Sequence, residues 1–200
     1  MRPLNPFVQA AFERLPRGGG YRFEPRPRRG IDDPTNPRDP HYDGVSRDLS
    51  LDGAVVARGA RDGATYCCGV TFEVWWWAMV DATGRPPPVD PTRARELLAQ
   101  WFCPTMGHAG VAAALVDAGL GVAVASEQAE PGDFVQYWRS TDLAAPSGHS
   151  AVFVGWDDAG DRRRLCYASS QPATDGVGHH AEIVEPDWTL AFVRATFAGS

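Results

Sequence analysis

The sequence predicts an α+β protein in which helices come first along the chain and an antiparallel β-sheet follows. Before residue 118, outside one long proline-rich stretch, apolar residues recur at helical spacing, and beyond Gly119 they follow the period of strands. The turns between the later strands are too short for crossover helices, so neighbouring strands must be antiparallel. Of the 200 residues, 44% are hydrophobic. This suffices for one sizeable core, and we expect a single domain over residues 1–200.

The first predicted helix covers residues 5–15, whose apolar residues share one face, and the glycines at 18–20 end it. From about residue 22 to residue 63 the chain is rich in Pro, Arg, Asp and Gly and shows no sustained period. This composition predicts a long ordered loop inserted into the domain at about 22–63.

The segment ATYCCGVTFEVWWWAMV predicts a second helix, with Thr65 as its N-cap and Gly84 at its end. Its apolar residues surround the helix on nearly all faces, which is typical of a helix buried in the centre of a domain. The tryptophans at 75–77 lie mid-helix with apolar neighbours. We therefore expect them in the core rather than on a ligand-binding surface.

Two more helices and five strands complete the predicted fold. Asp90 suits the N-cap of a third helix that begins at Pro91, and a fourth helix around 108–118 ends at Gly119. The predicted strands cover residues 133–138, 149–156, 164–171, 180–184 and 189–197.

Charge and hydropathy argue against two classes of function. The formal net charge of −6 disfavours nucleic-acid binding, which normally needs a basic surface. No stretch approaches the ~18 apolar residues of a membrane span, and the N-terminal residues lack the apolar run of a secretory signal. We therefore expect a soluble protein that is cytoplasmic as synthesised, with export only by a signal-independent route.

The four cysteines are too few and too irregularly spaced for a disulfide scaffold, and adjacent cysteines bridge only with strain, so we expect reduced thiols. Cys67 and Cys68 fall in the first turn of the second predicted helix. There the unpaired amides and the helix dipole favour negative charge, which lowers the pKa of a thiol and makes it a better nucleophile. The competing interpretation is that both are small core residues.

A catalytic thiol needs a base, and the chain offers His41, His108, His149, His179 and His180. His149 is the best placed, because it opens a predicted strand after a polar loop, where its side chain can project toward a helix N-terminus. A cysteine and a histidine brought together by the fold form the ion pair or general-base pair of thiol hydrolases.

The motifs around these residues resemble those of the NlpC-type cysteine peptidases, which are papain-like. CCGVTFEV resembles the Cys-Ser-Gly motif that opens the family's central helix, with Cys67 as the nucleophile, Cys68 in place of the serine and Gly69 as the glycine. PGDFVQYW and GHSAVFVGW are similar to the family's Pro-Gly-Asp strand and to its histidine strand. The resemblance covers about residues 63–171, with the cysteine before the histidine.

This resemblance implies a papain-like fold in which the central Cys-bearing helix packs on an antiparallel sheet. It also implies that Cys67 attacks an amide carbonyl while His149 takes and returns the proton. The family's usual substrates are peptides of the bacterial cell wall, so the implied partner is a peptide or a peptidoglycan fragment. The chain departs from the family at Tyr66, which replaces aspartate, and at Ala151, which replaces glycine.

Several residues are candidates for binding the oxyanion or the substrate: Tyr21, Tyr66, Cys68 and Ser169. The resemblance extends to Tyr21, whose counterpart in the family is thought to help the oxyanion site. Tyr42 is an alternative, as is the backbone amide of Cys67 acting with another donor.

A third catalytic residue follows from a predicted hairpin. The strand that His149 opens is joined to the next strand by a short turn, and a turn centred on Ala159 puts the residue facing His149 at 168–171.

Within that window Ser169 and Gln171 share the face of His149, whereas Ser170 points away. Gln171 is the preferred partner because its amide oxygen can accept the imidazole N–H without adding a charge. Asp175 is the alternative.

Two other functions stay open. One is a non-catalytic binding or structural domain of the same fold, with the long arginine-bearing loop as its contact surface. The other is a zinc site, although adjacent cysteines and a Cys-x4-His spacing differ from the usual Cys-x2-Cys pattern. Its possible ligands are Cys67, Cys68, Cys103, His108, Cys166, His179 and His180. We expect no cofactor or metal, and the oligomeric state is left open.

Overall fold

The fold combines helices with a mostly antiparallel sheet, so the predicted α+β class is confirmed. It is taken from a computed structural model that describes residues 1–22, 42–142, 147–160 and 162–198. Residues 23–41 of the predicted loop, which include His41, lie outside the described residues. Among those described, no helix is both long and apolar enough to cross a membrane.

The described chain contains four α-helices, at or near the predicted positions. They are α1 (Asn5–Glu13), α2 (Cys67–Thr83), α3 (Pro91–Trp101) and α4 (Gly110–Asp117). Two single turns of 3-10 helix are η1 (Ser126–Gln128) and η2 (Pro172–Thr174). The predicted N-cap Asp90 is confirmed, because its carboxylate accepts the Arg93 N–H at 2.8 Å. Gly84 ends α2 in the left-handed conformation, as its position suggested.

The main sheet has eight strands in the order β1-β10-β6-β7-β8-β9-β2, with β5 also paired to β10, and every pairing is antiparallel. Its strands are β1 (Arg2–Pro3), β2 (Gly18–Gly19), β5 (Gly121–Val124), β6 (Phe134–Ser140), β7 (Ser147–Ala159), β8 (Arg162–Gln171), β9 (Gly176–Ile183) and β10 (Thr189–Phe197). The five predicted strands are β6 to β10. The missed ones, β1, β2 and β5, are too short to show a period.

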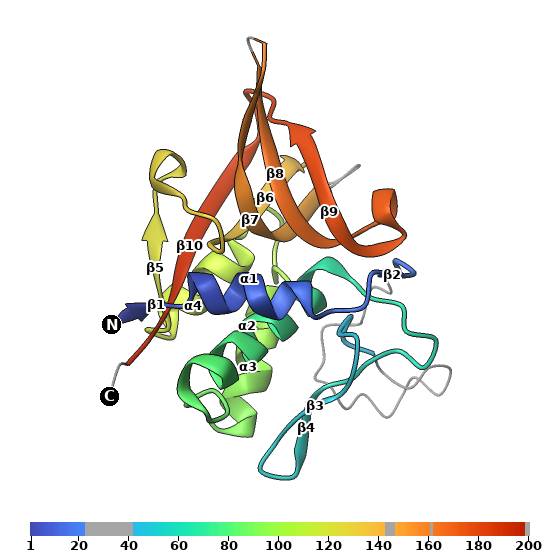
Figure 1. Cartoon of the computed structure of the whole chain (residues 1–200), viewed down its shortest axis with the longest axis vertical. Coiled ribbons are helices and arrows are strands. Elements are labelled where there is room, and N and C mark those ends of the chain that lie inside the picture. The colour runs from blue at the N-terminus through green and yellow to red at the C-terminus, as the bar shows by residue number, and fades with distance from the viewer. Residues whose placement is uncertain (23–41, 143–146, 161, 199–200) are drawn as a thin grey trace.

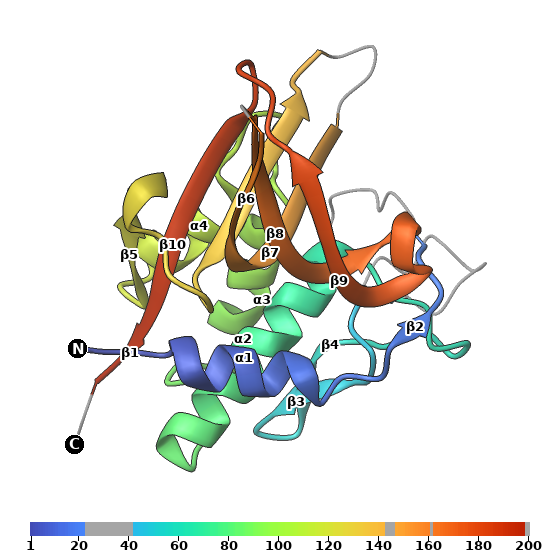
Figure 2. The same cartoon turned by 45° about the horizontal axis from the view of Figure 1, so that its top comes forward.

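The helices gather on one side of the long strands, as Figure 1 shows, and α2 packs on β7 and β8. Both views show α1 lying across α2 (Figure 1 and Figure 2). The main core lies between these layers and includes Trp75, Trp101 and Val152. A second apolar cluster, which includes Phe153 and Leu165, covers the opposite face of the strands. The central strands are therefore buried on both faces.

The tryptophan run of α2 is part of the core, as expected. Trp75 is fully buried and Trp76 nearly so, and Trp75 packs against Trp101 of α3 with ring centroids 5.8 Å apart. Trp77 is partly buried, and the guanidinium of Arg47 lies 4.6 Å from its ring centroid. Burial of these rings makes α2 the element around which the other helices assemble.

The prediction of a long ordered loop without secondary structure of its own at about 22–63 was wrong for residues 49–57. Strands β3 (Leu49–Leu51) and β4 (Ala54–Ala57) form a separate two-stranded hairpin. Asp52 and Gly53 form its turn with φ of 49° and 78°. An Asp-Gly pair between short apolar runs is a strong hairpin signal, so the sequence did contain the information.

The predicted N-cap Thr65 was also wrong. Tyr66 occupies the N-cap position with extended backbone, and no side chain among the described residues caps α2. The Thr65 hydroxyl instead lies 2.7 Å from the hydroxyl of Ser170 in β8. The hydroxyl is thus used for tertiary contact rather than for capping.

Gly69 of α2 is a glycine because another part of the backbone crosses the helix there. A Cβ atom at Gly69 would lie 2.2 Å from the carbonyl oxygen of Asp43 and 2.2 Å from the carbonyl carbon of Gly44. The same segment accepts the Tyr66 N–H on the Gly44 carbonyl at 3.0 Å. Close approach of residues 43–44 therefore fixes the position of the first turn of α2.

We predict that Gly69→Ala destabilises the protein by about 3 kcal/mol or more, because backbone atoms cannot move aside as a side chain can. Thermal unfolding measures the effect. Gly155→Ala is the control, since a Cβ there meets nothing within 4 Å. Helix propensity alone would make Gly69→Ala more stable than the wild type by about 1 kcal/mol. A Gly69→Ala protein that is as stable as the wild type, or more stable, would therefore contradict the close approach.

Candidate active site

The first turn of α2 meets the beginning of β7, and this contact brings Cys67 and His149 together. Cys67 is 1% exposed and His149 4%. The imidazole of His149 hydrogen-bonds the Cys67 sulfur, and the backbone N–H of Ser150 donates to the same atom. The two residues selected from the sequence as nucleophile and base are therefore neighbours.

The pKa of Cys67 lies well below its ordinary value of 9.0. Burial alone would raise this pKa, because a thiolate loses its hydration. The hydrogen bond from Cys68, the charge and hydrogen bond of His149, and the N–H of Ser150 outweigh burial. More of Cys67 is consequently thiolate near neutral pH than in a free cysteine.

Cys68 has the opposite character. Its sulfur lies 3.8 Å from that of Cys67. The pKa of Cys68 is raised well above 9.0, first by its hydrogen bond with Cys67 and then by burial and by the charges of Cys67 and Cys103. It therefore stays a protonated thiol that donates to Cys67, which favours Cys67 as the reactive residue.

Two of the predicted oxyanion candidates lie at the thiol. The Tyr66 ring stacks between Tyr21 and Phe102, at centroid distances of 5.5 Å and 5.9 Å. Burial raises the pKa of Tyr66, as do the charges of Cys67, Cys68 and Tyr21 and a hydrogen bond with Cys67. Tyr66 thus remains a neutral O–H donor beside the sulfur.

Tyr21 lies behind Tyr66. Burial, followed by the charges of Cys67 and Cys68, raises the pKa of Tyr21, while a hydrogen bond with Tyr66 lowers it. The alternative donor, Tyr42, is buried and gives its O–H to the Arg22 carbonyl. Of the three tyrosines, Tyr66 is the one whose own hydrogen bond reaches the thiol.

Hydroxyl groups join α2 to the sheet at the level of the thiol. Thr71, one turn after Cys67, has its hydroxyl 3.0 Å from the Cys67 carbonyl and 2.8 Å from the Ser150 hydroxyl. The indole N–H of Trp101 donates to the same Thr71 oxygen at 2.9 Å. Because Ser150 immediately follows His149, the contact between Thr71 and Ser150 sets the spacing between Cys67 and His149.

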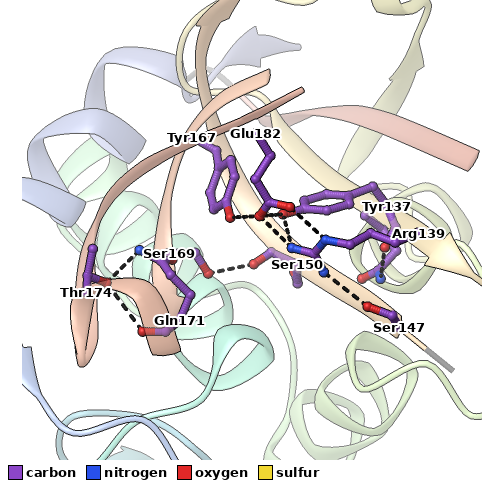
Figure 3. A network of polar contacts seen from close by, with 10 residues as sticks. Tyr137, Arg139, Ser147, Ser150, Tyr167, Ser169, Gln171, Thr174 and Glu182 are labelled. Atoms are coloured by element: carbon purple, nitrogen blue, oxygen red, sulfur yellow. Dashed lines mark hydrogen bonds and ion pairs between the residues drawn. The ribbon is translucent and has the colours of Figure 1, made fainter. Parts of the chain in front are cut away.

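Ser169 has a supporting position rather than a substrate-binding one. It is fully buried, and its hydroxyl donates to the Ser150 carbonyl at 2.7 Å, as Figure 3 shows. The contact fixes β8 against β7 next to His149.

The β7–β8 hairpin differs in detail from its prediction. Ala159 pairs with Arg162, so the turn comes later than the expected centre at Ala159. A β-bulge between Phe153 and Gly155 then shifts the register by one residue. Each shift by one residue reverses the face on which a side chain lies. Together the two differences leave Ser169 and Gln171 on the face of His149, as predicted.

The pairing of β7 with β8 ends at Val152–Ala168, and His149 and Gln171 each lie three residues beyond that pair on their own strands. Gln171 is 3% exposed. Its side-chain N–H groups donate to the Thr174 hydroxyl at 2.6 Å, as Figure 3 shows, and to the Gly178 carbonyl at 3.2 Å. A carbonyl only accepts, so these contacts fix which end of the amide is nitrogen.

Two of the buried side-chain atoms that lack a hydrogen-bond partner in the described part of the chain belong to these two residues. They are Oε1 of Gln171 and Nε2 of His149. One is an acceptor and the other a possible donor, on neighbouring strands at the same level. The alternative residue, Asp175, sits in a left-handed turn after η2.

Sequence reasoning missed a polar network beside His149. It consists of Tyr137 and Arg139 of β6, Tyr167 of β8 and Glu182 of β9 (Figure 3). The tyrosines alternate with apolar residues in their strands and match ordinary core positions. Arg139 and Glu182 are far apart in sequence, and no local motif links them.

The residues considered as zinc ligands are dispersed. In the described part of the chain no three His, Cys, Asp or Glu side chains come close enough to hold a metal ion. His179 pairs with Glu13 at 2.9 Å, and Nδ1 of His108 accepts the Gly110 N–H at 3.0 Å. Cys67, Cys68, Cys103 and Cys166 are free thiols.

A groove of about 780 Å³ lies elsewhere, along α4, β5 and β10. Its lining includes Val116, Trp156 and Trp188 and contains none of the candidate catalytic residues. It takes no part in the site around Cys67.

No protein-family model, curated protein or solved structure matches this chain.

We predict that iodoacetamide modifies Cys67 first and still does so at about pH 6 to 7, because a lowered pKa preserves thiolate as the pH falls below 9.0. Mass spectrometry of digests taken over time identifies the labelled residue. Cys67→Ser is the control, and it should abolish the fast phase. Faster labelling of Cys68, or slow labelling of all thiols alike, would contradict the arrangement.

We also predict that Glu182 makes the free energy of unfolding depend on pH in the acid range. Burial raises its pKa, but hydrogen bonds from Arg139 and Tyr167 and the charge of Arg139 lower it from 4.5 to about 2. The carboxylate therefore stabilises the fold above pH 4.5, and this contribution is lost as the pH falls from 4.5 toward about 2.

Glu182→Gln should lower the free energy of unfolding at neutral pH by about 2 kcal/mol, allowing for solvent around the half-buried carboxylate, and the difference should vanish near pH 2. Urea unfolding at several pH values measures it. Glu185→Gln, which removes an exposed partner of Arg162, is the control. A pH-independent difference would show that the pKa of Glu182 is ordinary.

Proposed function

We propose that this chain is a papain-like, NlpC-type thiol hydrolase that cleaves amide bonds. The observation that carries the proposal is the position of Cys67, in the first turn of a buried helix, with its pKa lowered by Cys68, His149 and the Ser150 N–H. The motifs that resemble the family support the proposed family and the cleavage of an amide bond. A thiolate beside an imidazole is the arrangement that attacks acyl groups.

In the proposed reaction the Cys67 thiolate adds to the carbonyl carbon, and the carbonyl oxygen becomes an oxyanion. The imidazolium of His149 then gives its proton to the leaving amine as the C–N bond breaks, which leaves a thioester on Cys67. Next, His149 takes a proton from water, whose oxygen adds to the thioester, and the proton returns to Cys67 as the acid leaves.

The oxyanion needs hydrogen-bond donors, and the first turn of α2 offers them. The Tyr66 hydroxyl is a neutral donor whose hydrogen bond reaches the sulfur. The unpaired N–H groups at the start of α2 add partial positive charge at the same point. This supports Tyr66, with the amide of Cys67, as the proposed donors in preference to Tyr21 or Tyr42.

His149 needs an acceptor that holds its tautomer, and we assign this role to Gln171. Its unpartnered Oε1 and the unpartnered Nε2 of His149 are complementary. A bond between them leaves Nδ1 of His149 for the thiol. A neutral amide orients the ring without adding charge beside the Cys67 thiolate.

The proposed substrate is a peptide of the bacterial cell-wall type, as the family resemblance implies. The near-complete burial of Cys67 favours a thin, extended substrate over a folded protein. No cofactor takes part in the proposed reaction.

The burial of Cys67 and His149 also favours one alternative, a non-catalytic domain that keeps the fold and binds a partner. The two hypotheses differ in the chemistry of the thiol. A binding domain has no reason to lower the pKa of Cys67, whereas a hydrolase requires it.

We predict that the protein releases new amino groups from muropeptides, and that Cys67→Ala and His149→Ala abolish this release while the proteins stay folded. Gln171→Ala should lower the rate about tenfold to a hundredfold, as loss of an orienting group does. A fluorescent assay for primary amines gives the rates, and circular dichroism checks folding.

Gln9→Ala is the matched control, since Gln9 is an exposed residue of α1 whose amide donates to the Pro131 carbonyl at 3.0 Å rather than toward the imidazole. Amine release by folded Cys67→Ala protein would exclude the mechanism. Rapid alkylation of Cys67 without amine release from any muropeptide would exclude the substrate class but not the chemistry.

A further inference from the structure

We propose that Tyr137 and Tyr167, anchored by Glu182, are positioning residues that hold the imidazole of His149 in line with Cys67. The inference rests on the proposed function and assigns a role to side chains outside the Cys-His-Gln arrangement.

Both tyrosine rings pack against the imidazole. Tyr137 is the direct cross-strand partner of His149, and its ring centroid lies 5.5 Å from that of His149 at an interplanar angle of 64°. Tyr167, on the other neighbouring strand, lies 5.4 Å away at 61°. The three ring centroids form a nearly equilateral triangle, so both edge contacts meet His149 from one side and restrict its rotation about its side-chain bonds.

The tyrosine rings are in turn anchored by one carboxylate. Oε1 of Glu182 accepts the hydroxyl of Tyr137 at 3.1 Å and also that of Tyr167. The two rings contact each other at 5.8 Å. Figure 3 shows Glu182 between Tyr167 and Tyr137, with Arg139 completing the group. A single residue of β9 therefore fixes both rings that pack against His149.

Arg139 fixes the charge of the anchor. Its Nε donates to Oε2 of Glu182 at 2.7 Å and its Nη2 to Oε1 at 2.5 Å. A bidentate ion pair of this kind keeps the carboxylate ionised and its geometry rigid. Burial raises the pKa of Tyr137 and of Tyr167, so both hydroxyls stay protonated donors.

In this network Arg139 and the two tyrosine hydroxyls donate to Glu182, and the charges of Arg139 and Glu182 cancel. Four successive strands, β6 to β9, contribute to the unit formed by His149 and its surroundings. Trp188 closes it from outside by stacking on Tyr137 at 5.4 Å with parallel rings. Such a unit sets where the imidazole points and adds no net charge beside it.

The test removes only the two hydroxyls. Tyr137→Phe with Tyr167→Phe keeps both rings and every charge, so any change in Cys67 arises from altered ring positions. The rate of iodoacetamide reaction at Cys67 is followed against pH. We expect the rate at about pH 6 to 7 to fall about tenfold and the midpoint to move toward 9.0.

Trp156→Phe is the control for stability alone, because it removes a hydrogen bond to Ser126 at 3.1 Å on the same face of the sheet. It should lower the melting temperature and leave the pH profile unchanged. If the double variant does not fold, the single Tyr167→Phe variant is compared in the same way, with a smaller shift expected.

An activated Cys67 in the wild type, with an unchanged pH profile in the folded tyrosine variants, would overturn the positioning role and leave the hydrolase proposal standing. A wild-type Cys67 that reacts like an ordinary thiol would overturn both.

Discussion

The fold of the candidate site depends on one contact, between the first turn of α2 and the adjoining strands β7 and β8. Thr71 meets Ser150 at 2.8 Å, and Thr65 meets Ser170 at 2.7 Å. Each such hydrogen bond contributes only about 1 kcal/mol net, but an unpaired buried hydroxyl costs more, so alternative alignments are disfavoured. The contact brings a helix N-terminus to the start of a strand, and Cys67 and His149 occupy these two places.

Contacts with residues 43–46 also hold α2 in this position. The backbone at residues 43–44 crosses α2 at Gly69, where no side chain fits. Glu73 of α2 is fully buried and accepts both the N–H and the hydroxyl of Ser46, which fixes the following part of the same segment. The first turn of α2 is thus held from the sheet on one side and from this segment on the other, which limits its motion.

Much of this arrangement could be predicted from sequence because it depends on local patterns. Apolar spacing predicted α2 and the strands β6 to β10, and a cysteine at a helix start with a histidine at a strand start predicted the pair. The failures depend on tertiary contact. Thr65 bonds a distant serine instead of capping α2. Gly155 indicates a possible bulge, but the register shift itself is set by pairing with β8. The network of Glu182 joins residues from three strands, which no single-segment pattern can indicate.

The central claim is that Cys67 is a thiolate, stabilised by its hydrogen bond with Cys68 and by the charge and hydrogen bond of His149. The ultraviolet absorbance of thiolate, titrated in the wild type and in Cys67→Ser and His149→Ala proteins, tests it without any substrate. The account predicts a step well below the ordinary value of 9.0 that disappears in Cys67→Ser and moves upward in His149→Ala. A wild-type titration with no step below that value, or a low step that His149→Ala leaves in place, would contradict it.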